Sequence, residues 1–179
     1  MEVTIGIDPG LEGACYIRNA SVSGNSFAIA TSVGVIPQGV RHIFIDNALL
    51  LCPNNPKEWG DEGFLYLFSG LTGDAAIEKV GGMPRNQGMF RFGQGYQGLR
   101  LAVVCQGLTL TDYRPQVWQH LVGLRPKENY WELAMKQYPE LHNALVTKRG
   151  RALVDRAAAL LIHDAHLIQR GKINVQISA

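Results

Sequence analysis

An alternating run of apolar and polar residues, stopped by Asp8–Gly10, constrains the fold more than any other feature of this sequence. Val3, Ile5 and Ile7 share one side of a predicted strand, and Asp8 ends that strand on the side opposite to them. The proline and glycine after Asp8 force a turn, and Gly13–Ile17 is predicted to return as a second, antiparallel strand. The chain therefore begins with a β-hairpin that carries a carboxylate where its first strand ends.

The remaining pattern mixes strands with helices. Further strands are predicted at Phe27–Val33, within His42–Leu51, and at Asp74–Val80 and Thr109–Tyr113. Helices are predicted at Arg114–Leu121, Glu128–Tyr138 and Ala152–Arg170, and a short one could cover Phe64–Leu71. The glycine-rich segment Gly81–Gly98 is predicted to be a mobile loop that enters a helix near Gln97. Strands first, then strands alternating with helices, predict an α/β fold with a mixed central sheet flanked by helices.

Length and composition favour a single globular unit. The chain has 179 residues, of which 46% are hydrophobic and 18% charged. This suits one domain over residues 1–179, with a short tail after about residue 170. No apolar run approaches the roughly 20 residues that cross a bilayer, and the amino terminus lacks the layout of a signal peptide. We expect a cytoplasmic protein with no membrane partner.

Three acidic residues stand at the ends of predicted elements: Asp8, Glu78 and Asp155. Glu78 interrupts an apolar strand, where a buried charge is costly unless it is paired or binds a metal. Asp155 lies in the first turn of the last helix, on a side rich in small apolar residues. Each acid also has an ordinary interpretation, namely a turn contact for Asp8, a solvated edge-strand residue for Glu78 and a helix-dipole partner for Asp155.

Together the three acids fit one chemistry. Carboxylates at two strand ends and one helix start can share a pair of Mg²⁺ ions, and two such ions about 4 Å apart promote phosphodiester hydrolysis. Hard oxygen ligands suit Mg²⁺ or Mn²⁺, and the sequence has no histidine and cysteine cluster that would favour zinc.

Basic residues are concentrated in two segments although the net charge is only +2. Residues 80–100 contain arginines and no acid, and so does the short segment Thr147–Arg151. The candidates for phosphate contacts are Arg85, Arg91, Lys148, Arg149 and Arg151. Phe90 and Phe92 could stack on unpaired bases, or could instead pack onto the core. These patches predict a shaped anion-binding surface.

Several segments, in order, resemble the RuvC-type Holliday junction resolvases of the ribonuclease H-like superfamily, particularly their bacteriophage members. They are Ile5–Gly10 with Gly13, Ala76–Pro84, Phe92–Tyr96, Arg114–Trp118 with Gly123–Leu124, and Lys148–Ile162. The resemblance implies a ribonuclease H-like fold with its active site at the rim of the sheet. It also implies a homodimer that uses Mg²⁺ to nick opposing strands of four-way DNA junctions, in a bacterial or phage-infected cell. By position, Asp8, Glu78 and Asp155 match the family's metal-binding acids, which hold two ions per active site when the set is complete.

One position departs from the family. A second acid is usual three residues after the first on the last helix, and that position holds Ala158. A pair spaced i, i+3 puts both carboxylates on one helical face, so alanine leaves the metal site a ligand short. The alanine could be an engineered substitution or a natural loss. His163 or Asp164 could replace the acid, but both lie about two turns further along and are rotated away.

The aromatic residues Trp118, Tyr130 and Trp131 are predicted to be core or dimer contacts, and His163 and His166 to be surface residues near the end of the last helix. A junction-binding protein of the same fold without catalysis is the main alternative function. A polynucleotidyl transferase of the same superfamily is another. The opening motif also resembles actin-like ATPases, but 179 residues are too few for the two domains that such enzymes need.

Overall fold

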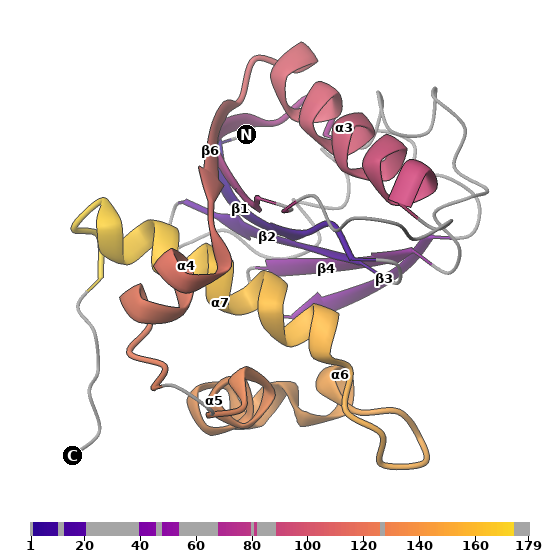
Figure 1. Ribbon diagram of the computed structural model, residues 1–179, viewed down its shortest axis with the longest axis vertical. Helices are drawn as coiled ribbons and strands as arrows, with labels where there is room; N and C mark the ends of the chain where they lie inside the picture. Colours follow the sequence, from indigo (N-terminus) through magenta and orange to yellow (C-terminus); the bar gives the residue numbers. More distant parts are fainter. Residues whose placement is uncertain are drawn as a thin grey trace.

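A mixed β-sheet forms the centre of the protein (Figure 1). The computed structural model describes residues 2–10, 13–20, 40–45, 48–53, 68–79, 81, 89–125 and 128–173. Their strands are β1 (Glu2–Asp8), β2 (Ala14–Asn19), β3 (Val40–Ile45), β4 (Ala48–Pro53), β5 (Thr72–Glu78) and β6 (Thr109–Tyr113). The strand order is β3-β4-β2-β1-β5-β6. The prediction of an α/β fold with a mixed central sheet is confirmed.

Strand direction changes at β1, the first strand of the predicted hairpin. β1 pairs antiparallel with β2 and parallel with β5, and β5 pairs parallel with β6. Because parallel neighbours need a crossover connection, helix α3 (Met89–Cys105) links β5 to β6. The connection therefore leaves from the carboxyl end of β5, and α3 runs back across one face of the sheet to the start of β6.

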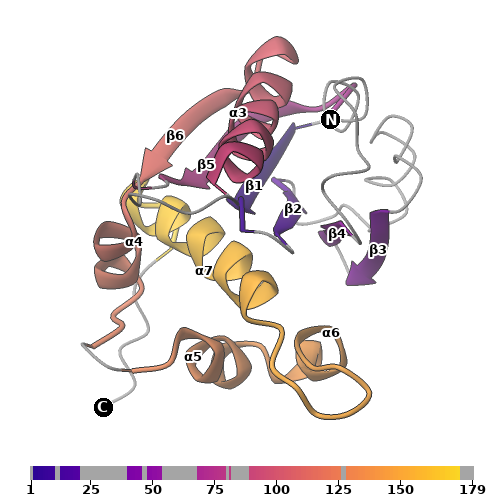
Figure 2. The same cartoon turned by 45° about the vertical axis from the view of Figure 1, so that its right-hand side comes forward.

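The two faces of the sheet bury separate sets of side chains, as alternation along β1 predicts. Ile5 and Ile7 are buried in one cluster with Val103 of α3. Tyr16 of β2 belongs to the cluster on the opposite face, where it packs with residues of α7 (Val154–Gln169) such as Leu160. Figure 2 shows α3 alone over one face and α7, with α4 (Pro115–Leu121) and α5 (Tyr130–Gln137), over the other. The sheet is therefore flanked by helices on both sides.

Gly6 allows α7 to lie directly against β1. A Cβ atom at this position would lie 2.6 Å from the backbone nitrogen of His163 and 2.7 Å from its Cβ, and closer still to the carbonyl oxygen of Ala159. Those atoms belong to a helix backbone and cannot be moved as a flexible side chain could. The glycine is thus required by a close approach of helix and strand, and it fixes the depth of α7 on the sheet.

The helices on the α7 face follow each other closely. Pro115 occupies the first position of α4, where its missing N–H costs nothing. The side chain of Asn129 caps α5 by accepting a hydrogen bond from the backbone N–H of Trp131 at 2.9 Å. A 3-10 turn (Pro139–Leu141) and the short α6 (His142–Leu145) then lead to α7. None of the helices in the described ranges is both long and apolar enough to span a bilayer.

Three local predictions differ from the structure. Helix α3 begins at Met89 and not near Gln97, so much of the glycine-rich segment is helical and not a loop. Packing of Leu99, Ala102 and Val103 into the core outweighs the poor helix propensity of the glycines. The apolar stretch within residues 42–51 is divided between the paired strands β3 and β4.

The described part of Phe64–Leu71, residues 68–71, contains a turn and no helix. The predicted strand Phe27–Val33 and the end of the tail, residues 174–179, lie outside the described residues.

Adding a methyl group at Gly6 is expected to destabilise the protein. Gly6→Ala should lower the free energy of unfolding by at least about 2 kcal/mol, because the helix backbone must move to accept the new atom. Gly93→Ala is the matched control, since Gly93 is exposed on α3 and a Cβ there would meet nothing within 4 Å. The control should be neutral or slightly stabilising in urea unfolding. Equal effects of the two substitutions would contradict the close-approach role of Gly6.

Candidate active site

Asp8 lies at the end of β1 on the face covered by α7. Alternation along the strand places its side chain on the same side as Gly6, which faces the helix. Its Oδ1 accepts a hydrogen bond from the backbone N–H of Gly10 at 2.9 Å. This is the turn contact that the sequence left open as an alternative, and it orients the carboxylate.

Asp155 reaches the same turn from the first turn of α7. Its Oδ2 accepts a hydrogen bond from the backbone N–H of Gly13 at 2.9 Å. A Cβ atom on Gly10 would lie 2.9 Å from Asp155 Oδ2 and 3.2 Å from Asp8 Oδ1. The two carboxylates therefore flank one point above the turn, and only glycine leaves that space open. The structure brings together residues that are far apart in the sequence.

Glu78 approaches from the neighbouring strand. The register of β1 and β5 pairs Ile7 with Ile77, so Asp8 and Glu78 follow at the next position of each strand. Glu78 alternates with Ala76, which belongs to the cluster on the α7 face, so both acids are on that face. Its Oε2 accepts a hydrogen bond of 2.7 Å from the indole Nε1–H of Trp118.

The three acids interact electrostatically. Burial raises the pKa of Asp8 to about 8, helped by the charges of Asp155 and Glu78 and opposed by the Gly10 hydrogen bond. Burial also raises the pKa of Glu78, as does the charge of Asp155, whereas the Trp118 hydrogen bond lowers it. Neither Asp8 nor Glu78 forms an ion pair with another of the described residues. Mutual repulsion in a partly buried space is the condition that a bound cation relieves.

Tyr130 and Trp118 form part of the wall of this acidic site, a role that the sequence did not suggest. Burial raises the pKa of the Tyr130 hydroxyl, and the charges of Asp8, Asp155 and Glu78 raise it further. The rings of Trp118 and Tyr130 meet edge to face, with centroids 5.9 Å apart. Trp118 is buried as predicted for a core residue, but its one polar atom points to an acid.

The donor chemistry fits a hard divalent cation, because the side chains that converge are all carboxylates. The three acids do not surround a single ion position: in the described ranges, no group of three or more histidine, cysteine, aspartate or glutamate side chains could hold one ion. The pair formed by Asp8 and Asp155 is assembled at Gly10, and Glu78 is held by Trp118. Binding of Mg²⁺ or Mn²⁺ here remains a prediction.

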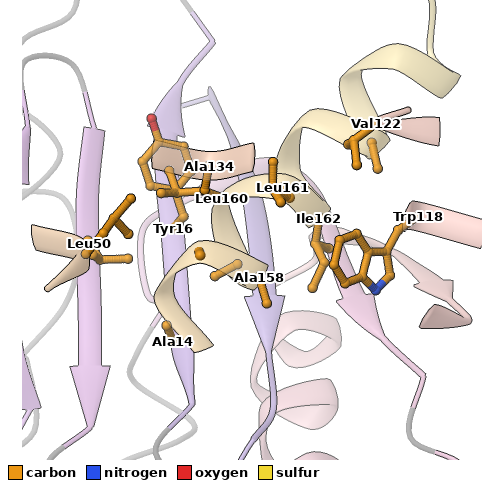
Figure 3. Packing of buried hydrophobic residues seen from close by; sticks show 14 of the residues in the cluster. Ala14, Tyr16, Leu50, Trp118, Val122, Ala134, Ala158, Leu160, Leu161 and Ile162 are labelled. Atoms are coloured by element: carbon orange, nitrogen blue, oxygen red, sulfur yellow. The ribbon is translucent and has the colours of Figure 1, made fainter. Parts of the chain in front are cut away.

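Ala158, the position of the expected fourth acid, is 2% exposed and lies among apolar side chains (Figure 3). The two residues considered as substitutes are engaged elsewhere. Asp164 accepts a hydrogen bond from the Tyr138 hydroxyl at 2.5 Å, and its other oxygen lies 3.1 Å from His163 Nδ1. Both carboxylate oxygens of Asp164 therefore already have partners.

His163 and His166 are buried, so their prediction as surface residues is wrong. His166 Nδ1 lies 3.1 Å from the Tyr113 hydroxyl, and burial lowers the pKa of His166 to about 4. The close approach of α7 to β1 encloses this side of the helix, which a helix-dipole argument does not take into account.

The predicted DNA contacts that the structure describes fall on two elements, the loop before α7 and the start of α3. Lys148, Arg149 and Arg151 are exposed on the loop between α6 and α7, a few residues before Asp155, and Figures 1 and 2 show this loop projecting from the body. Hydrogen bonds close the loop as a tight turn, including one from the Arg151 N–H to Thr147 Oγ1 at 3.0 Å.

The aromatic candidates lie on α3, not on the mobile loop that was predicted. Phe92 is partly buried in the first turn of α3, the helix that follows β5 in the chain. Phe90 and Arg91 belong to the same helix, but their side chains are not among the described ones, and Arg85 lies outside the described residues.

The fold is similar to that of solved RuvC structures. RuvC of Thermus thermophilus matches with a TM-score of 0.53 and 17% identity, over 95% of this chain and 97% of that protein. T. thermophilus RuvC in complex with Holliday junction substrate matches with a TM-score of 0.54 and 16% identity, over 96% and 98%. No family model and no curated protein matches the sequence. These similarities establish a ribonuclease H-like fold, with a mixed sheet flanked by helices, as the sequence predicted.

The raised pKa of Asp8 predicts a pH-dependent stability in metal-free protein. The folded state favours the protonated acid up to pH of about 8, whereas an ordinary aspartate ionises near 3.8, so stability falls as pH rises between these values. Asp8→Asn should remove this loss. Its unfolding free energy minus that of the wild type should therefore be larger at pH 8 than at pH 5, by more than about 1 kcal/mol. Urea unfolding in a chelator measures both. Glu140→Gln removes an exposed carboxylate and should follow the wild-type profile. A profile of Asp8→Asn that runs parallel to that of the wild type would refute the raised pKa of Asp8.

Proposed function

We propose that the protein is a structure-selective endonuclease that uses Mg²⁺, or Mn²⁺ in its place, to cut branched DNA, four-way junctions above all. The observation that carries the proposal is the convergence of Asp8 and Asp155 at Gly10, with Glu78 coupled to them, on a ribonuclease H-like sheet. A RuvC protein of the same fold has been solved with a Holliday junction substrate. The likeness to bacteriophage members rests on the sequence motifs alone.

Each residue has a defined role in this proposal. Asp8, Glu78 and Asp155 would hold the cations, and the backbone N–H groups of Gly10 and Gly13 orient two of the carboxylates. Bound divalent ions supply an activated water and stabilise the leaving oxygen of the phosphodiester. In a homodimer, two such sites would nick opposing strands, and the products would be two linear duplexes.

DNA would be held by residues outside the acidic site. Lys148, Arg149 and Arg151 are exposed at the loop that leads into α7, the helix that carries Asp155 in its first turn. Phosphate contacts of this kind position the nucleic acid without reading its sequence. Phe92, near the start of α3, is the candidate to stack on an unpaired base at a branch point, together with Phe90. Arg85 and Arg91 are proposed as further phosphate contacts.

A second candidate function is favoured by Ala158. The residue is buried, with no acid side chain at a position where the family carries a metal ligand. A protein that binds branched DNA without cutting it would retain the fold, the loop charges and the aromatic residues. The two functions differ only in turnover, so one substitution separates them.

Restoring an acid at residue 158 is expected to raise Mg²⁺-dependent cleavage. Ala158→Asp and Ala158→Glu should each increase the rate of junction nicking by at least about tenfold, which corresponds to about 1.4 kcal/mol in the barrier. The assay compares a labelled four-way junction with linear duplex in Mg²⁺, Mn²⁺ and chelator. Gln169→Glu is the matched control, because it adds the same charge at the exposed far end of α7 and should change nothing.

The outcomes distinguish the candidate functions. Tight junction binding without cleavage, in Mn²⁺ and with either acid restored, would support the non-catalytic protein. Strand-transfer products in place of nicks would indicate a polynucleotidyl transferase. Equal action on junction and duplex would overturn the structure selectivity.

Removing a charge from the loop before α7 tests the DNA surface independently of cleavage. Arg149→Ala should weaken binding to junction and duplex together, and should reduce by about 1 the slope of log affinity against log salt concentration. Lys172→Ala serves as the comparison, because Lys172 lies past the other end of α7 with its Nζ 3.9 Å from Asp74 Oδ2. If both variants bind with the wild-type salt slope, the loop does not contact phosphate.

A further inference from the structure

Trp118 presents one polar atom to the acidic site from an otherwise apolar setting. Its side chain is 1% exposed and is among the largest that are fully buried. Figure 3 shows the indole beside Ile162 of α7, in the cluster that also contains Val122. The indole Nε1–H is a donor only, and here it donates to Glu78 Oε2 at 2.7 Å.

The position of this donor is fixed by packing on several sides. α4 begins two residues after Tyr113, which is the residue paired with Glu78 across β5 and β6. The backbone N–H of Lys79 donates to the Tyr113 carbonyl at 2.6 Å, which ties the end of β5 to the start of this segment. The Tyr130 ring, at 77° to the indole, closes another side. A ring held in this way offers its N–H at a nearly constant place.

The side chain of Glu78 is thereby restrained. A glutamate has three rotatable side-chain bonds, and an unrestrained one loses that freedom when it binds a cation. The hydrogen bond to Trp118 leaves one carboxylate oxygen engaged and fixes the group within electrostatic reach of Asp155. Partners that orient a metal-binding carboxylate typically change metal affinity 10–100-fold when removed.

We propose that Trp118 is a positioning residue for the divalent cation: its indole N–H holds Glu78 in place and so sets the affinity of the acidic site for Mg²⁺ or Mn²⁺. The inference rests on the proposed function, because it requires that this site bind such a cation. It adds a residue that carries no charge and coordinates nothing itself. Its effect is transmitted only through Glu78.

The test is titration of the full chain with MnCl₂ by isothermal titration calorimetry. Trp118→Phe keeps a buried ring and removes the donor, and it should weaken Mn²⁺ binding by about 10–100-fold. Trp131→Phe is the matched control: its indole Nε1–H also makes a hydrogen bond, of 2.9 Å, but to the Leu145 carbonyl outside the acidic site. This control should bind Mn²⁺ within about twofold of wild type. In a Glu78→Gln background, Trp118→Phe should cause no further loss.

The results separate the two proposals. If the wild type binds Mn²⁺ and Trp118→Phe binds it equally or more tightly, the positioning role is overturned and the proposed function stands. Equal weakening by the two tryptophan variants has the same meaning. Wild-type protein that binds no Mn²⁺ overturns both. A second test uses only the wild-type chain, so it does not depend on the folding of a variant. On addition of MgCl₂ the indole N–H resonance of Trp118 should shift and that of Trp131 should not, and a static Trp118 resonance refutes the role.

Discussion

The close approach of α7 to β1 at Gly6 is the contact on which the acidic site depends. Helix backbone occupies the space that a side chain at Gly6 would need. This contact fixes both the distance and the register between β1 and α7. Asp8 follows Gly6 by two residues on the same face, and Asp155 precedes Ala159 by one helical turn. The carboxylates meet at Gly10 because the backbones are packed in this way. Their own interaction is repulsive and would separate them.

That repulsion costs stability in the metal-free protein, and other contacts hold the helix in place. At its carboxyl end, Arg170 pairs with Asp74 of β5 at 3.1 Å, and α7 buries every residue from Ala157 to Leu167, most of them apolar. Hydrogen bonds to Tyr113 and Tyr138 fix its rotation. A strongly perturbed carboxyl group in an otherwise well-packed interface is characteristic of a functional site, where stability is lost in favour of binding. The perturbation is concentrated at Asp8, where all three acids interact.

Features governed by local periodicity could be predicted from the sequence, and features governed by tertiary contact could not. Alternation placed Asp8 and Glu78 opposite Ile7 and Ile77, and helical spacing placed Asp155 on the side of α7 that faces the sheet. Helix α3 was predicted to start too late because its glycines have low propensity, while its core contacts are invisible along the sequence. The burial of the histidines follows from Gly6, which lies far from them in the chain. The hydrogen bond between Trp118 and Glu78 joins two elements whose proximity exists only in the folded sheet.

Ala158 links stability to activity at this site. The pKa of Asp8 already lies near 8 with two acidic neighbours, and a fourth carboxylate one turn after Asp155 would raise the repulsion further in the absence of cation. An alanine there fills the core and leaves the metal-free fold more stable. In the proposed metal site, the same alanine would leave the divalent ions one carboxylate ligand fewer. Under the proposed function, the cation affinity of this site, more than the fold, would decide whether the protein cuts a branched substrate or only holds it.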